Sequence, residues 1–102
     1  MTLDEARQHI EVHCGKGWLP LVDKAFDRLP PGLTIACAFQ KYGRLKFDTT
    51  ARDEAYDEYL SDIADESAAM CEVCGEAASE QIVDGWVTTL CDPHFAELSN
   101  KG

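Results

Sequence analysis

Three cysteines and one histidine near the C-terminal end of the sequence have the types and spacing of a metal site. They form two pairs, each with two residues between its members, and sixteen residues separate the pairs: Cys71, Cys74, Cys91 and His94. Thiolate sulfur and imidazole nitrogen are the ligands that Zn²⁺ takes in tetrahedral structural sites. A catalytic zinc keeps one position for water or substrate, whereas this set supplies all four ligands. The sequence therefore predicts one structural zinc ion.

The residues between the two ligand pairs support this prediction. A glycine after the second cysteine permits the turn of a zinc knuckle, and EQIVDGWVTTL reads as two short strands around an Asp-Gly turn. Asp92 followed by proline supplies an N-cap and a first helical residue, which places His94 in a first helical turn. This layout predicts a small treble clef that needs its metal to fold. The alternative is that the spacing of these two pairs is accidental and the cysteines are ordinary free thiols.

A second group with reactive side chains lies near the N-terminus. His9 and His13 are four residues apart, and Cys14 follows the second. They are candidates for a second metal site or a Cys-His catalytic pair, but the sequence places no acid or third ligand to complete either. We therefore favour two ordinary surface histidines.

The sequence predicts no enzyme. A treble-clef nuclease would need a general-base histidine and a metal-binding histidine or asparagine inside the clef, and residues 75–90 contain neither. No phosphate loop, nucleophile elbow or paired-carboxylate signature appears elsewhere.

Local patterns predict the elements that position these groups. Residues 2–14 read as a helix capped by Thr2 and Glu5, with an apolar side of Leu3, Ala6, Ile10 and Val12. GKG ends this helix, a second follows over residues 18–29, and PPG at 30–32 stops it.

A β-hairpin is expected next, with strands at residues 33–40 and 44–48 around a KYG turn. Strand alternation directs Leu33, Ile35, Cys37 and Phe39 inward with Leu45 and Phe47, so Cys37 is a predicted core residue. Three cations form a basic tip on this hairpin: Lys41, Arg44 and Lys46.

Residues 50–70 give the clearest helical pattern and run directly into Cys71. One side carries the packing residues Tyr56, Leu60, Ile63, Ala64 and Ser67. The opposite side carries an acidic row of Glu54, Glu58, Asp62 and Asp65. The predicted fold class is α+β, with a body over residues 1–70 and a zinc-binding module over residues 71–102, packed as one unit.

The charge is uneven along the chain. The net charge is −10, with a balance of +2 over residues 1–47, −7 over 48–66 and −5 over 67–102. Such asymmetry repels phosphate backbones and attracts basic surfaces. The first residues lack the apolar run of a signal peptide and no stretch could span a bilayer, so we expect a cytoplasmic protein without a membrane role.

The acidic row has two interpretations. Like charges four residues apart on a helix cost about 0.2–0.5 kcal/mol per pair, and the predicted helix face offers no lysine or arginine to offset this. The row is therefore either a solvated face that aids solubility or a surface that occupies a basic groove.

These residues resemble a family of small bacterial and phage-associated proteins of uncharacterised function. The shared features are GW near a helix start (GKGWLPLVDK), a KYG-type or KFG-type hairpin leading into LRF (QKYGRLKFD), and a terminal CEVCG, GW, TLC and H signature. The resemblance covers most of the chain from Cys14 to His94. It implies the same four metal ligands and no activity. This chain has LKFD where LRFY is common, so Asp48 extends the acidic region.

The leading hypothesis is a non-enzymatic, zinc-stabilised acidic protein that inhibits or regulates a basic protein partner, such as a nuclease or nucleic-acid-binding effector. Its predicted partner surface consists of the acidic row together with the basic tip. Phage anti-defence inhibitors of the anti-CRISPR type and nuclease-toxin immunity proteins share this physical profile. The alternative is a transcription or nucleic-acid regulator, which a charge of −10 disfavours. The sequence leaves open the oligomeric state and whether Trp18, Tyr42 and Trp86 are core or interface.

Overall fold

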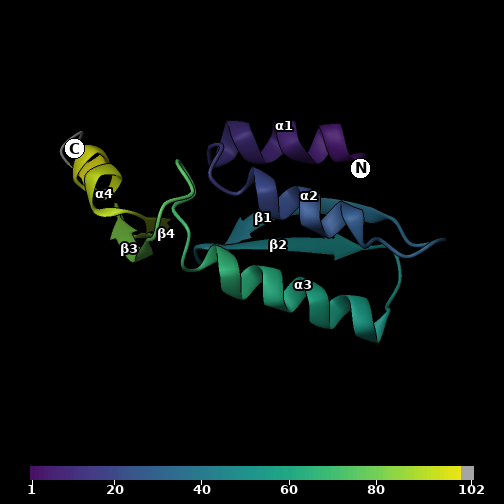
Figure 1. The fold of residues 1–102 in the computed structure, drawn as a ribbon. Coiled ribbons are helices and arrows are strands. Elements are labelled where there is room, and N and C mark those ends of the chain that lie inside the picture. The colour runs from purple at the N-terminus through teal and green to yellow at the C-terminus, as the bar shows by residue number, and fades with distance from the viewer. Residues whose placement is uncertain (100–102) are drawn as a thin grey trace.

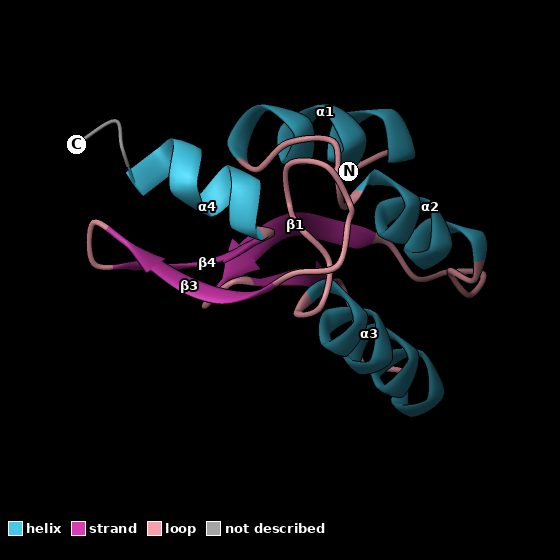
Figure 2. Cartoon of the chain, turned by 60° about the vertical axis from the view of Figure 1, so that its left-hand side comes forward, coloured by secondary structure: helices cyan, strands magenta, loops and turns pink. Residues whose placement is uncertain are grey.

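The computed structural model describes residues 1–99, which form an α+β fold of four helices and two antiparallel hairpins (Figure 1). In chain order the elements are α1 (Leu3–His13), α2 (Leu19–Asp27), β1 (Ile35–Lys41), β2 (Arg44–Thr49), α3 (Glu54–Ser67), β3 (Ser79–Val83), β4 (Trp86–Leu90) and α4 (Asp92–Ser99). Figure 2 shows that β3, β4 and α4 form a unit at one end of the helices and the first hairpin. Within residues 1–99, no helix is long and apolar enough to cross a membrane.

Side-chain caps set the starts of the two longest helices. The Thr2 hydroxyl accepts from the Glu5 backbone N–H and the Glu5 carboxylate accepts from the Thr2 N–H, which is the predicted capping box. The Asp53 carboxylate accepts from the Tyr56 N–H at 2.9 Å and so begins α3. The helix predicted over residues 50–70 was therefore too long at both ends. The last residue of α3 is Ser67, and a turn separates α3 from Cys71.

Both hairpins close with two-residue turns. The pairing registers place Tyr42–Gly43 between β1 and β2, and Asp84–Gly85 between β3 and β4. All four residues have positive φ, from 52° to 83°. This is the type I′ geometry, whose twist matches that of the flanking strands. The Asp-Gly turn predicted from the sequence is therefore confirmed.

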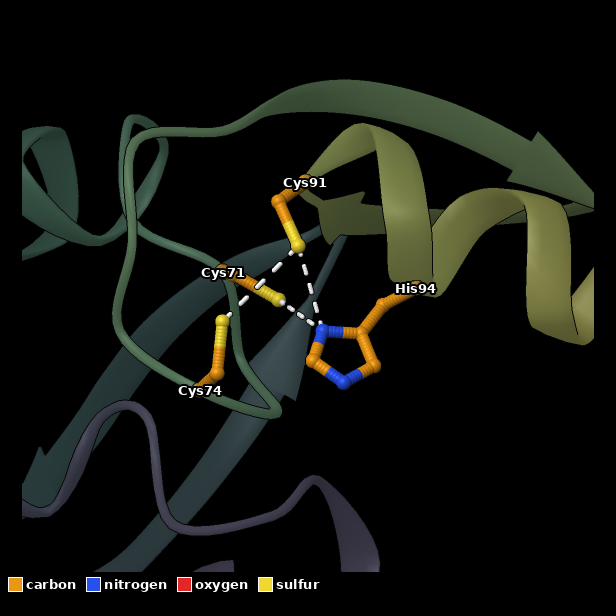
Figure 3. A group of neighbouring side chains, drawn as sticks. All are labelled: Cys71, Cys74, Cys91 and His94. Atoms are coloured by element: carbon orange, nitrogen blue, oxygen red, sulfur yellow. Dashed lines mark hydrogen bonds between the residues drawn. The ribbon is translucent and has the colours of Figure 1, made fainter.

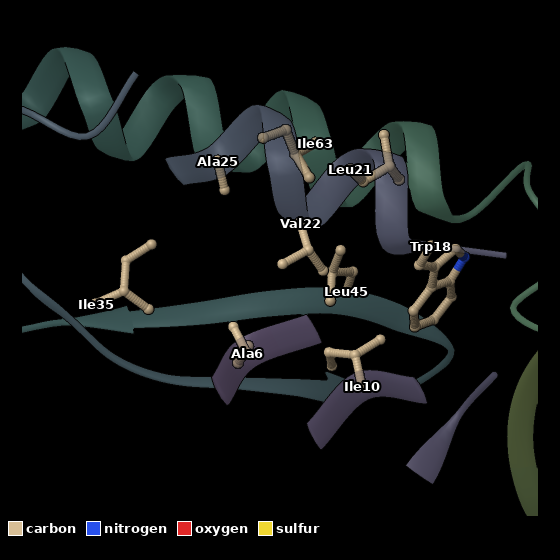
Figure 4. Packing of buried hydrophobic residues seen from close by; sticks show 10 residues of the cluster. Ala6, Ile10, Trp18, Leu21, Val22, Ala25, Ile35, Leu45 and Ile63 are labelled. Atoms are coloured by element: carbon tan, nitrogen blue, oxygen red, sulfur yellow. The ribbon is translucent and has the colours of Figure 1, made fainter. Parts of the chain in front are cut away.

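The core lies between three helices and one face of the first hairpin (Figure 4). Its fully or almost fully buried residues come from α1, α2, α3 and both strands: Ala6, Ile10, Trp18, Leu21, Val22, Ala25, Ile35, Ala38, Leu45 and Ile63. Trp18 is therefore a core residue, whereas Tyr42 and Trp86 are exposed. The predicted packing side of α1 was partly wrong, because Val12 is 73% exposed.

The predicted alternation of β1 was also wrong. The strand starts at Ile35, and the register with β2 shifts between Ile35 and Cys37. An irregularity of this kind reverses the faces of the residues that follow it. Ala38 consequently joins the core, while Cys37 and Phe39 are half-buried and lie outside it. Cys37 is not the core residue that the sequence suggested.

The outer edge of β2 is covered by α3. The backbone N–H of Leu45 donates to the Ser67 hydroxyl at 2.8 Å, and this hydroxyl donates to the Ala64 carbonyl at 2.6 Å. Ser67 and Leu45 are both fully buried. An unpaired N–H here would have no access to water, so the serine satisfies a strand edge that the hairpin leaves open.

Replacing Ser67 by alanine should destabilise the protein by about 1–3 kcal/mol, because it leaves the buried Leu45 N–H without an acceptor. Urea unfolding would measure the change. Ser61→Ala is the matched control, since Ser61 is exposed on the same helix and its loss should change stability by less than about 0.5 kcal/mol. Equal effects of the two substitutions would contradict this role for Ser67.

Candidate metal centre

The four predicted ligands converge at the junction between the first hairpin and the C-terminal unit (Figure 3). One ligand atom from each of Cys71, Cys74, Cys91 and His94 lies within 4.8 Å of the others. The His94 Nδ1 atom is 3.1 Å from the Cys91 Sγ and 3.6 Å from the Cys71 Sγ, and the Cys74 and Cys91 sulfurs are 3.7 Å apart. We call this cluster the metal centre.

A tight backbone turn positions the first ligand pair. The Gly75 N–H donates to the Cys71 carbonyl, and the Cys71 N–H donates to the Glu76 carbonyl, both at 2.8 Å. Gly75 has a φ of 82°, a conformation that other residues adopt only with strain. The glycine that follows the second cysteine is therefore required by the turn, as the sequence indicated.

The β3–β4 hairpin and α4 position the second pair. Leu90 and Cys91 are buried at the end of β4, and α4 starts at Asp92, one residue earlier than predicted. The Phe95 N–H donates to the Cys91 carbonyl at 2.8 Å, which closes the first turn of α4. His94 thus lies one helical turn from Cys91 and faces the cysteines, as Figure 3 shows.

The surroundings of the thiols change their acidity in opposite directions. Burial would raise the pKa of the Cys71 thiol, but backbone N–H groups of Cys91, Cys74 and Val73 outweigh burial and lower this pKa to about 7. At Cys74 the backbone of Glu76 lowers the pKa, but burial and the two neighbouring cysteines raise it overall. A cysteine binds a metal ion as a thiolate. The backbone donors around the buried Cys71 stabilise this deprotonated form and so favour metal binding.

This donor set is compatible with a structural metal ion. All four ligands come from the protein, three are cysteines, and the cluster lies in a small apolar group that includes Leu90 and Phe95. A tetrahedral site with four protein ligands has no position for substrate.

The GKG loop, residues 15–17, packs directly against the first ligand pair. The Gly17 N–H donates to the Glu72 carbonyl at 2.9 Å, and the Trp18 indole donates to the Met70 carbonyl at 2.9 Å. A side chain at position 17 would overlap the Cys71 carbonyl oxygen. The sequence suggested only that these glycines end a helix, but Gly17 also permits close approach to the knuckle.

Glu72 is a buried carboxylate at the same junction and was not among the predicted site residues. It is 7% exposed and accepts a hydrogen bond from the Gln40 amide of β1, and its carboxylate also faces the Thr89 N–H. Burial raises its pKa, which these donors oppose. The Thr89 hydroxyl donates to the Gly43 carbonyl, so the turn of the first hairpin also contacts the module.

The predicted partner surface is only partly separate from other charges. The row residues Glu54, Glu58, Asp62 and Asp65 are all exposed on α3. Asp65, however, pairs with Arg44 of β2 at 2.8 Å, and the same guanidinium lies 3.8 Å from Glu80 of β3. The helix face itself carries no lysine or arginine, as the sequence indicated, but Arg44 of the first hairpin offsets the row at Asp65. Lys41 and Lys46 of the basic tip are exposed.

No family model, curated protein or solved structure matches this chain.

Proposed function

We propose that this protein is a non-enzymatic binding protein, held together by one structural zinc ion, that uses the acidic row of α3 to engage a basic protein partner. The observation that carries the proposal is the exposure of Glu54, Glu58 and Asp62, which form no ion pair within residues 1–99. The same helix buries its other side in the core.

Zinc is supported by the distances between the donors. An ion with Zn–S bonds of about 2.3 Å and Zn–N bonds of about 2.0–2.1 Å separates tetrahedral sulfurs by about 3.8 Å, and sulfur from nitrogen by about 3.5 Å. The observed separations are 3.7 Å between two sulfurs and 3.6 and 3.1 Å between sulfur and nitrogen. The order of knuckle, β3–β4 hairpin and α4 supports a treble-clef-like module.

The row is spaced to match a repeating set of cations. Its first and last members are eleven residues apart, which corresponds to about 16 Å at 1.5 Å per residue. An isolated ion pair on a protein surface contributes little binding free energy. Several exposed carboxylates that face a basic groove nevertheless steer the partner and accelerate association. A nuclease or nucleic-acid-binding effector presents such a groove. The protein would then act as a cytoplasmic inhibitor, an immunity protein or a regulator.

The nucleic-acid regulator is the weaker interpretation. Its basic patch would rest on Lys41, Arg44 and Lys46, with Lys16 nearby in sequence, and Arg44 already contacts two carboxylates. A phosphate would have to displace both of them. With a net charge of −10, the whole molecule also repels a phosphate backbone.

The proposal is tested by removing the charges of the row without changing its shape. The variant Glu54→Gln, Glu58→Gln and Asp62→Asn should lose its partner in a pull-down from cells of the native source. With the purified partner it should bind at least tenfold more weakly at low salt than the wild type. The difference should shrink as salt is raised, because exposed charges are screened.

A matched control keeps the same change in net charge. Asp27→Asn, Glu76→Gln and Glu97→Gln remove three exposed carboxylates outside the row and should bind as the wild type does. If the row variant and the control retained the same partner with the same affinity, the acidic row would have no part in recognition. A gel shift at low salt distinguishes this proposal from the nucleic-acid regulator. Salt-dependent binding to duplex or single-stranded DNA would favour the regulator.

A further inference from the structure

The two N-terminal histidines lie against each other on α1. His9 and His13 are four residues apart, and their ring centroids are 4.2 Å apart with planes tilted by 34°. Side chains at this spacing lie on the same face of a helix, one turn apart. The chain has three histidines, and the third, His94, belongs to the metal centre.

The hydrogen bonding of His13 leaves one ring nitrogen available. Its Nδ1 atom is 2.9 Å from the His9 carbonyl oxygen, which can only accept, so this nitrogen carries the proton. In the neutral ring the Nε2 atom then has a free lone pair. Histidine ligands in metal sites commonly donate their second ring N–H to a backbone carbonyl, which fixes the tautomer and the ring orientation.

A hollow beside the rings leaves room for an ion and its other ligands. It has a volume of about 280 Å³ and lies between the end of α1 and β1, where His9, Ile10, His13, Cys14, Phe39 and Gln40 line it. The lining includes the imidazole rings of both histidines, each of which offers a nitrogen donor.

Neither ring is held in an ion pair within residues 1–99. His9 is half-buried and His13 is exposed. Two ligand nitrogens on a tetrahedral ion with bonds of about 2.0–2.1 Å are about 3.3 Å apart. The ring centroids of His9 and His13, 4.2 Å apart, are separated by a distance of the same order.

We propose that His9 and His13 form a second metal site, a bis-imidazole chelate for a borderline divalent transition ion such as Zn²⁺, Ni²⁺ or Cu²⁺. Imidazole suits this class of ion, and carboxylate-preferring ions such as Mg²⁺ and Ca²⁺ are excluded by the nitrogen donors. Two protein ligands leave open coordination positions toward the hollow, in contrast to the closed metal centre. The site is weaker and more exchangeable than the metal centre, and it is independent of the proposed function.

The test uses the full chain loaded with one equivalent of zinc and then titrated with Ni²⁺ in an isothermal calorimeter. The wild type should take up one further equivalent. His9→Gln and His13→Gln, singly and together, should weaken this step at least tenfold, and zinc retained by each variant would show that the metal centre is intact. Glu11→Gln, which neutralises an exposed carboxylate on the same helix, should bind Ni²⁺ as the wild type does.

A second readout needs no variant. Ni²⁺ is paramagnetic, so it should broaden the imidazole proton signals of His9 and His13 in the wild type before those of His94. The proposal is overturned if the zinc-loaded wild type binds no further ion. It also fails if the double variant binds Ni²⁺ as tightly as the wild type, or if the signals of His9 and His13 stay sharp while Ni²⁺ binds.

Discussion

Replacing Cys71 and Cys91 by serine together is expected to abolish metal binding and to unfold the C-terminal module, residues 71–99. Each ligand pair loses one buried cysteine, so only Cys74 and His94 remain as ligands. Small zinc modules gain about 10–16 kcal/mol from their metal, whereas a whole domain is stable by about 5–15 kcal/mol. The loss therefore exceeds what the apolar group around Leu90 can replace.

Metal analysis and thermal unfolding would measure this effect, and a strong chelator added to the wild type should reproduce it. Cys37→Ser is the control, because Cys37 is half-buried outside the metal centre and should leave the metal content unchanged. Unchanged zinc content and an unchanged melting temperature in the double variant would refute the structural role of the ion.

The second large effect is expected from Gly17→Ala. The added methyl group would overlap the Cys71 carbonyl oxygen and lie 2.6 Å from the Gly75 nitrogen. Both are backbone atoms of the knuckle and cannot rotate away. Overpacking against side chains typically costs about 1–3 kcal/mol, and a clash with backbone should exceed that range. We also expect weaker metal binding, because relief of the clash displaces the first ligand pair.

Gly32→Ala separates this contact from backbone strain. Gly32 has a φ of 82° and nothing within 4 Å of an added Cβ, so its substitution should cost only about 1–2 kcal/mol of left-handed strain. Gly17 has no positive φ, so its effect comes from the clash alone. Urea unfolding and zinc competition would compare the two variants. Equal losses of stability with equal zinc affinity would show that the junction is not tightly packed.

The metal centre and the acidic helix were predictable because their signals are local. The ligand spacing fixes two short turns, and the Asp-Gly turn and the start of α4 depend on neighbours in sequence. The 3.6-residue period of α3 likewise predicted that Tyr56 and Ile63 would be buried. These features follow from chain geometry over a few residues.

The remaining features depend on contacts between distant segments. Three hydrogen bonds link residues far apart in the sequence: Gly17 to Glu72, Trp18 to Met70, and Arg44 to Asp65. No rule of sequence spacing relates such pairs. The irregularity in β1 shifted the faces of Cys37 and Ala38 without a glycine or proline to mark it. One extra residue in a strand moves the side chains that follow it to the opposite face. A prediction from strand alternation alone then assigns these side chains to the wrong face.

The two tryptophans give the chain a natural pair of fluorescence reporters. Trp18 is fully buried, and its indole N–H donates a hydrogen bond to the Met70 carbonyl next to the first ligand pair. Trp86 is 76% exposed on β4. Loss of the ion should therefore shift the emission of Trp18 toward that of a solvated indole. Trp86 already contacts water and serves as an internal reference. One optical spectrum can thus follow the junction between body and module without a label.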